Sequence, residues 1–185
     1  MNCWMINIDE KNYGVTCALG YKLQGFGIRQ KKKTDRMEPG DKMIYYVREW
    51  RSFVLSATIT SKVFEEQTIH WESVKANEKF VRRIRFKPDL VMEKDQYVDG
   101  LQIAPRLEYL KRWPPERWVL ALEGELHLLP RRDFELIEGE MKRTLGLPVP
   151  EFTEGNLRKG SSPLRRARKR KGNESDSVTE QQPVE

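Results

Sequence analysis

The N-terminal part of the chain alternates short apolar runs with polar segments, which is typical of β-structure with short connections. CWMINI at residues 3–8 is apolar at most positions and predicts a strand. Residues 9–20 have the polar start and the glycine end of a short helix. The chain is therefore predicted to open with a strand and then a helix.

A tight turn and a hairpin are predicted next. Glu-Pro-Gly-Asp at residues 38–41 is a turn sequence, because proline presets φ and glycine supplies a positive φ, and it places a strand at 42–47. Apolar and polar positions alternate over 52–60, the period of a half-buried strand. We expect these two strands to pair antiparallel through a hairpin near residues 49–51.

A further strand at residues 79–87 is predicted to have one apolar and one cationic face. Its alternating positions are Phe80, Ile84 and Phe86 on one side and Arg83, Arg85 and Lys87 on the other. We expect the apolar side to face the sheet and the cations to face solvent.

The C-terminal half predicts short helices and loops over residues 88–117, where a proline pair prevents a continuous helix. A last strand is predicted at 118–124. The segment 129–146 has a proline near its start, apolar Phe134, Leu136 and Ile137, basic residues in its last turn and a terminal glycine, so it predicts an amphipathic helix. Residues 147–185 contain too little apolar surface to fold and are predicted to be disordered.

Composition and charge limit the partners. The chain has 185 residues and a formal charge of +6, and residues 157–185 alone hold eight Lys or Arg against four Asp or Glu. That tail therefore carries most of the excess, and nucleic-acid affinity in the nearly balanced domain must come from a local patch. No apolar stretch approaches a membrane span, so we expect no membrane partner. Cys3 and Cys17 show no metal spacing and no signal peptide precedes them, so we expect a cytoplasmic setting.

Recognisable catalytic chemistry is missing from the sequence. The histidines, His70 and His127, have no metal-ligand spacing, and no nucleophile elbow, Walker loop or dinucleotide glycine fingerprint occurs. We therefore predict no metal, no cofactor and no enzymatic activity. Aromatic side chains interleaved with Lys and Arg favour a binder, because rings stack on unpaired bases and cations contact phosphates.

Several motifs in a fixed order resemble the EVE domain of the PUA-like superfamily, which is related in fold to the YTH readers of methylated RNA. They are WMIN at 4–7, GFGIRQKKK at 25–33, RMEPGDKMIYYV at 36–47, VRRIRF at 81–86, RW at 117–118 and LPRRDFELI at 129–137. The resemblance implies an α+β fold, a PUA-like twisted mixed β-barrel flanked by short helices, over residues 1–146, followed by the disordered basic tail. It also implies a pocket for a single base, often a modified one.

The resemblance and the aromatic-basic pattern together give the candidate site. The nucleic-acid and base-binding residues are predicted to be Trp4, Asn7, Phe26, Gly27, Ile28, Lys31, Lys32, Tyr45, Tyr46, Arg83, Arg85 and Trp118. Trp4 would stack on the base, Asn7 would bind its edge, and Lys31, Lys32, Arg83 and Arg85 would form a cationic rim.

The roles of several of these residues stay open, because each could also pack in the core or face away from the pocket. Trp4 and Trp118 are also natural core residues, since aromatic side chains dominate burial. Trp4 and Asn7 face opposite ways in an ideal strand, as do Tyr45 and Tyr46, of which Tyr46 is preferred for the pocket.

The predicted function is a non-catalytic module that binds a flipped or unpaired base, with RNA favoured over DNA as partner, acting as a monomer. The alternatives are a nucleic-acid-processing or nucleotide-processing enzyme with an unrecognised carboxylate site, and a protein-interaction adaptor that kept the barrel and lost the pocket.

Overall fold

The structure, a computed structural model, describes residues 1–73 and 78–149. These residues belong to the first of two units into which the chain divides, Met1–Pro150. Disorder was predicted for residues 147–185. Residues 150–185 lie outside the described part of the chain, so their disorder stays a prediction.

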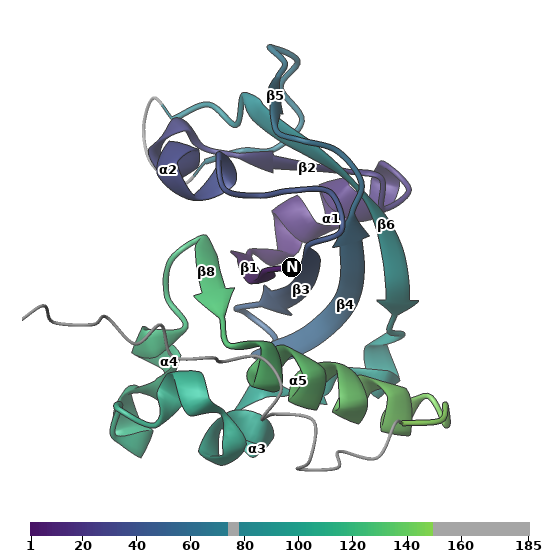
Figure 1. The fold of residues 1–185 in the computed structure, drawn as a ribbon, viewed down its shortest axis with the longest axis vertical. Coiled ribbons are helices and arrows are strands. Elements are labelled where there is room, and N and C mark those ends of the chain that lie inside the picture. The colour runs from purple at the N-terminus through teal and green to yellow at the C-terminus, as the bar shows by residue number, and fades with distance from the viewer. Residues whose placement is uncertain (74–77, 150–185) are drawn as a thin grey trace, which may run out of the picture. The chain divides into compact units, whose positions relative to one another are not determined.

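Eight strands within the described ranges form one curled mixed sheet (Figure 1). Its spatial order is β2 (Leu23–Phe26), β6 (Arg82–Val91), β4 (Ser52–Ile59), β3 (Lys42–Val47), β1 (Cys3–Ile8) and β8 (Leu126–Leu129), with β5 (Phe64–Glu65) and β7 (Val98–Asp99) pairing with β6 and β4. β1 and β3 run parallel and the other pairs are antiparallel. The path ends at β2 and at β8, so the barrel is a curled sheet with an open seam, and the predicted mixed α+β fold is confirmed.

Short helices flank the sheet. They are α1 (Glu10–Ala18), α2 (Lys31–Thr34), α3 (Gly100–Ile103), α4 (Trp118–Ala121) and α5 (Arg131–Thr144), with 3-10 turns at Ile28–Gln30, Lys94–Gln96, Ala104–Arg106, Glu108–Leu110 and Pro115–Arg117. In Figure 1, α3, α4 and α5 lie below the curled sheet, and α2 lies with β2 at its other end. The predicted first strand, first helix, hairpin and closing helix are all confirmed.

Local sequence signals explain these elements. Asp9 caps α1 because its carboxylate accepts a hydrogen bond from the Asn12 N–H at 2.7 Å. Gly40, at φ +91°, makes the turn before β3. The pairing of β3 with β4 shifts register between Tyr45 and Tyr46, so a bulge lies beside both tyrosines.

The prediction of a last strand at residues 118–124 is wrong. The proline pair starts a 3-10 turn at Pro115 that continues directly into the helix α4. Gly124 then turns the chain at φ +104°, and the strand begins only at Leu126, where it pairs with β1. The turn chemistry on either side of the apolar run therefore decides its conformation.

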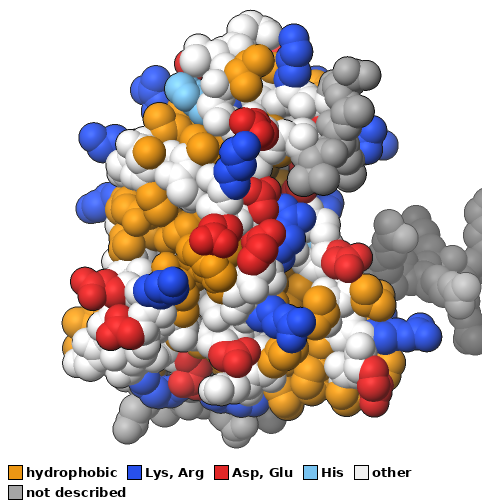
Figure 2. Space-filling view, turned by 180° about the vertical axis from the view of Figure 1, so that it is seen from behind, with side chains coloured by type: hydrophobic (Ala, Val, Ile, Leu, Met, Phe, Trp, Pro, Cys, Tyr) orange, Lys and Arg blue, Asp and Glu red, His pale blue; other side chains and the backbone are white. Residues whose placement is uncertain are grey.

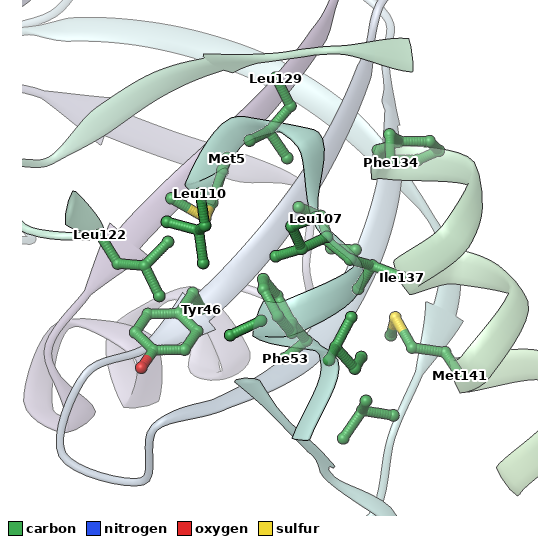
Figure 3. Close-up of a cluster of buried hydrophobic side chains, with 14 of the residues drawn as sticks. Met5, Tyr46, Phe53, Leu107, Leu110, Leu122, Leu129, Phe134, Ile137 and Met141 are labelled. Carbon is green, nitrogen blue, oxygen red and sulfur yellow. The ribbon is translucent and has the colours of Figure 1, made fainter. Parts of the chain in front are cut away.

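Two buried clusters lie on opposite faces of the central strands. One fills the space between the sheet and α5, with Met5, Phe53 and Ile137 among its members (Figure 3). The other lies inside the curl and contains Trp4 and Tyr45. Because side chains alternate along β1 and β3, neighbouring residues of these strands belong to different clusters.

Candidate functional site

A cavity of about 540 Å³ lies at the open seam of the curled sheet. Its walls come from the end of β1 with the start of α1, from β2, from the turn between β3 and β4, from residues 71–73, and from the loop 123–125 before β8. The register of β8 on β1 runs only from Cys3 to Ile6, so the last residues of β1 lie beyond the paired edge. The volume is within the range of about 300–1,000 Å³ that is usual for small-ligand pockets.

Two residues that line the cavity, Asn7 and Tyr46, each have a buried polar atom without a hydrogen-bond partner among residues 1–73 and 78–149: Asn7 Oδ1 and the Tyr46 hydroxyl. The two residues are direct partners in the parallel pairing of β1 with β3, so their side chains share one face of the sheet. Asn7 is 7% exposed and Tyr46 2%. The Asn7 amide donates to the Leu122 carbonyl at 2.5 Å, and this bond directs Oδ1 as the free acceptor.

The Tyr46 ring is packed in the core, whereas its hydroxyl has no hydrogen-bond partner among the described residues. The ring packs at 5.2 Å from Phe53 in the cluster beneath the sheet, and Figure 3 shows the hydroxyl pointing away from the other labelled side chains. Burial raises the pKa of Tyr46, with a lowering contribution from Arg51 and a raising one from Asp99. The hydroxyl therefore stays protonated at neutral pH and can donate or accept one hydrogen bond.

Four aromatic residues line the cavity: Phe26, Tyr46, Trp71 and Phe80. Trp71 is held on several sides. Its indole N–H donates to Thr16 Oγ1 at 3.0 Å, and the Arg83 guanidinium lies 4.6 Å from its ring centroid. A Cβ at Gly25 would come within 2.5 Å of the Trp71 ring, so only glycine lets this indole lie against β2.

The loop before β8 is fixed by its own contacts. The Asn7 N–H donates to the Glu125 carbonyl at 3.1 Å, and Lys33 Nζ donates to the Leu126 carbonyl at 2.5 Å. Buried His127 contacts the Gly124 carbonyl through Nε2 at 3.1 Å and the Tyr109 hydroxyl through Nδ1 at 2.8 Å. Burial lowers the pKa of His127, so the neutral ring donates from Nε2 and accepts at Nδ1.

Charged side chains of both signs line the cavity. Asp9 accepts from Arg48 at 3.1 Å and from Asn12, and exposed Glu72 pairs with exposed Lys11 at 2.5 Å. The other charged residues that line it are Arg51, Glu123 and Glu125. Figure 2 likewise shows acidic and basic side chains interspersed on the face opposite to that of Figure 1.

Trp4 does not border the cavity, which corrects the predicted stacking role. Its side chain is fully buried inside the curl, and its indole N–H donates to Asp41 Oδ2 at 3.1 Å. Asn7 lies three positions further along β1 and so faces the other way, as strand geometry requires. Asn7, Phe26 and Tyr46 do line the cavity, and their role in binding stays a prediction.

The four residues of the predicted cationic rim do not line the cavity. Arg83 is fully buried, and its guanidinium donates to the carbonyls of Phe80 and Thr68 instead of facing solvent. Arg85 is exposed on β6, where it lies over the Phe64 ring, and Lys31 and Lys32 are exposed on α2. None of these four residues lines the cavity, although Gln30, directly before α2, does.

The remaining predicted residues surround the site without lining it. Tyr45 is fully buried, and its hydroxyl donates to Gln24 Oε1 at 3.1 Å. Gly27 is buried against the Glu78 side chain, and Ile28 is half-exposed. Trp118 packs at the edge of the cluster beneath the sheet and donates its indole N–H to the Trp113 carbonyl at 3.1 Å.

Trp71, Phe80 and Gly25 are cavity residues that the sequence analysis missed. A signal for Trp71 exists, since a tryptophan in the mostly polar stretch of residues 65–79 has no alternating or helical apolar pattern to join. No sequence period connects that stretch with β1 or β2, because the contact is made only when the sheet curls.

The described part of the chain contains neither a metal-binding cluster nor a membrane-spanning helix. Within residues 1–73 and 78–149, no group of three or more His, Cys, Asp or Glu could hold a metal ion. In the same ranges, no helix combines the length and the apolar character needed to cross a bilayer.

Comparison with solved structures identifies the fold. The chain resembles a YTH domain-containing protein mmi1 in complex with RNA, at TM-score 0.55 and 9% identity over 78% of this chain and 86% of that one. It also resembles the YTH domain of Zygosaccharomyces rouxii MRB1 in complex with N6-methyladenosine RNA, at TM-score 0.53 and 12% identity over 81% and 90% of the chains. The chain has the fold of the YTH domains.

A third structure extends this likeness to bacteria. Protein PSPTO5229 from Pseudomonas syringae matches at TM-score 0.50 and 10% identity, over 75% of this chain and 99% of that one. No family model matches the sequence, and no curated protein matches it either. The shared fold agrees with the curled mixed sheet and flanking short helices that the resemblance implies, and at these identities it establishes the fold alone.

Proposed function

We propose that the protein is a non-catalytic nucleic-acid-binding module that takes a single flipped or unpaired base into the cavity at the open seam. RNA is the favoured partner. The base enters between β1 and β2, its polar edge meets Asn7 and Tyr46, and its phosphates stay outside the cavity.

The pair of unpaired polar atoms carries this proposal. A buried polar atom without a partner costs about 1–3 kcal/mol, so folded proteins satisfy nearly all of them. Here Asn7 and Tyr46 are partners in the strand register and line the same cavity, and Asn7 Oδ1 and the Tyr46 hydroxyl have no partner among the described residues. The edge of a base supplies both donors and acceptors and would satisfy both atoms.

The aromatic walls suit the faces of a base. Stacking on an aromatic side chain contributes about 1–3 kcal/mol per base. Phe26, Trp71 and Phe80 line the cavity, and Trp71 is fixed by Thr16 and by the Arg83 guanidinium. The stacking role first expected of Trp4 therefore passes to these residues.

Cations beside the cavity suit the flanking phosphates. Lys31, Lys32 and Arg36 are exposed in and after α2, which follows the cavity residue Gln30 directly. Arg51 lines the cavity itself and is exposed. Phosphate contacts fix position without reading sequence, so specificity would come from the cavity.

The structural neighbours support a nucleic-acid partner. Two of them are YTH domains in complexes with RNA, one of which contains N6-methyladenosine. The presence of a cavity of about 540 Å³ also disfavours the alternative of an adaptor that lost its pocket.

Fluorescence anisotropy with labelled RNA and DNA oligonucleotides of one sequence, at low and moderate salt, tests the proposal. Tyr46→Phe removes only the hydroxyl and should weaken RNA binding roughly three- to tenfold. Tyr97→Phe makes the same change at a half-buried tyrosine outside the cavity lining and should leave affinity unchanged. All variants keep the basic tail, so differences between them report on the cavity.

Two results would contradict the proposal. One is equal affinity of Tyr46→Phe and the parent protein, and the other is no RNA binding at low salt. Catalysis is tested separately by incubating the protein with labelled RNA, DNA and nucleotides, with and without Mg²⁺. We expect these substrates to remain unchanged. Turnover that a point mutation abolishes would favour the alternative that the protein is a nucleic-acid-processing or nucleotide-processing enzyme.

A further inference from the structure

The charged residues that line the cavity do not balance one another. Four carboxylates belong to its described lining, Asp9, Glu72, Glu123 and Glu125, against the guanidiniums of Arg48 and Arg51. A neutral base edge would not require this excess, and a phosphate inside the cavity would be repelled by it. The excess therefore points to the charge of the ligand.

The excess comes from the loop before β8. Asp9 is paired with Arg48 at 3.1 Å and Glu72 with Lys11 at 2.5 Å, so the two carboxylates of the loop, Glu123 and Glu125, remain against Arg51 alone. Glu123 has no ion pair or side-chain hydrogen bond within the described chain, and Glu125 accepts only from the neutral Gln30 amide, at 3.4 Å. Contacts from Asn7, Lys33 and His127 to carbonyls of residues 124–126 fix the backbone of this loop, which carries both carboxylates beside the cavity.

The rest of the lining also suits a cation. Aromatic faces attract positive charge through their quadrupole, and Phe26 and Phe80 supply such rings, while the Trp71 ring already carries the Arg83 guanidinium. Asn7 Oδ1 is a buried acceptor without a donor in the described residues, and a hydrogen bond from a cationic donor is roughly twice as strong as a neutral one.

We propose that the cavity selects a base that carries a positive charge, namely a ring-N-methylated adenine or cytosine, over the neutral isomer of the same base. This inference rests on the proposed function, since it names the class of base that enters the same cavity. A base is favoured over a trimethylated lysine side chain, because a quaternary ammonium has no N–H for the Asn7 oxygen.

Isomeric bases provide the test. One unstructured RNA sequence is prepared with a single variable position that carries 1-methyladenine or N6-methyladenine, and in a second pair 3-methylcytosine or 5-methylcytosine. Within each pair the composition of the base differs only by the position of the methyl group and one proton, and only the first member is cationic at neutral pH. We expect the full-length protein to bind the cationic member about tenfold more tightly.

The carboxylates are tested by a double variant. Glu123→Gln with Glu125→Gln keeps the size of both side chains and should reduce the preference to about twofold or less. The control, Glu38→Gln with Glu116→Gln, changes the net charge equally at residues outside the cavity lining and should keep the preference. Because the attraction is electrostatic, the preference should also shrink as salt is raised.

The outcomes separate this inference from the proposed function. Equal affinity within each pair, or tighter binding of the neutral isomer, overturns the charge selection and leaves base binding intact. A preference that survives the Glu123 and Glu125 double variant also overturns it. Failure of every RNA to bind at low salt removes the proposed function as well. Binding of a trimethyl-lysine peptide as tight as that of the cationic RNA would overturn the inference in favour of a protein ligand.

Discussion

The inside of the curl and the open seam use the same residue types in opposite ways. Inside the curl, the Trp4 indole donates to Asp41 and the Tyr45 hydroxyl donates to Gln24, so both of these polar groups are paired. At the seam, the neighbouring Asn7 and Tyr46 each keep a buried polar atom that has no partner within the described part of the chain. Tyr45 and Tyr46 are consecutive, and only the face of the strand separates the two environments.

This difference distinguishes residues that stabilise the fold from residues kept for a ligand. Paired polar groups contribute to stability, whereas a buried unpaired group reduces it by about 1–3 kcal/mol. A protein keeps such a destabilising group where its function uses it, and this is a common cause of the trade-off between stability and activity. On this criterion Trp4 belongs to the scaffold and Tyr46 to the site.

The largest expected effect is on stability, at Trp4. Trp4→Ala removes a fully buried indole and should lower the free energy of unfolding by about 3–5 kcal/mol, measured by urea denaturation. Trp113→Ala, at a side chain that is 42% exposed, should change it by less than about 1 kcal/mol. A small loss of stability at Trp4 together with lost RNA binding would place Trp4 at the site after all.

The partner of Trp4 should make the scaffold sensitive to acid. Burial by itself raises the pKa of Asp41, but hydrogen bonds from the Asn2 N–H, the Trp4 indole and the Glu38 N–H lower the pKa overall, below 3.8. A carboxyl with a depressed folded pKa stabilises the fold above its unfolded pKa, and this contribution is lost as the pH falls through the folded value.

We therefore expect Asp41→Asn to be about 2 kcal/mol less stable than the parent at pH 7, since hydrogen bonds to charged groups contribute about 1.5–3 kcal/mol. Urea denaturation of both proteins from pH 7 down to pH 2.5 measures the difference, which should narrow only below the unfolded pKa of 3.8. A difference that stays constant over this range would mean that the Asp41 charge does not stabilise the scaffold.

The sequence predicts the scaffold better than the site. Period-two alternation and the Glu-Pro-Gly-Asp turn are local signals, and they place β3, β4 and their hairpin correctly. The amphipathic pattern likewise predicts α5. The strand placed at 118–124 fails because flanking prolines and Gly124, rather than the apolar run, decide the conformation there.

The cavity depends on contacts that no local pattern contains. Strand alternation predicts that Tyr45 and Tyr46 diverge, but it does not say which of them meets an open seam. Arg83 has the sequence pattern of a solvent-facing cation, yet the segment before β6 folds over it and supplies carbonyl acceptors from Thr68 and Phe80. Trp71 reaches the cavity only because Gly25 leaves room for its ring.

The adjacent tyrosines give a smaller and sharper test. Tyr45→Phe removes a buried hydrogen bond and should lower the free energy of unfolding by about 1 kcal/mol. Tyr46→Phe removes an unpaired hydroxyl and should leave stability unchanged or slightly higher, measured by the same denaturation. Equal destabilisation of both variants would mean that the Tyr46 hydroxyl is paired in solution and would remove the contrast between curl and seam.

The smallest effect on stability should come from α2, and there the salt dependence of binding is informative. Replacing exposed Lys31 and Lys32 by Ala should change the free energy of unfolding by less than about 0.5 kcal/mol. Each lysine that pairs with an RNA phosphate adds about 0.7 to the slope of log affinity against log salt for a single strand. The double variant should therefore lower this slope by up to about 1.4.

Arg85→Ala with Lys87→Ala removes the same charge from β6, where both side chains are exposed and outside the cavity lining, and should leave the slope unchanged. Anisotropy titrations at four salt concentrations measure both double variants. A lower slope for the β6 variant alone would mean that RNA runs along β6 and not past Gln30 and α2. The phosphates would then not pass the seam on the side of α2, and the proposed path of the RNA past the cavity would be wrong.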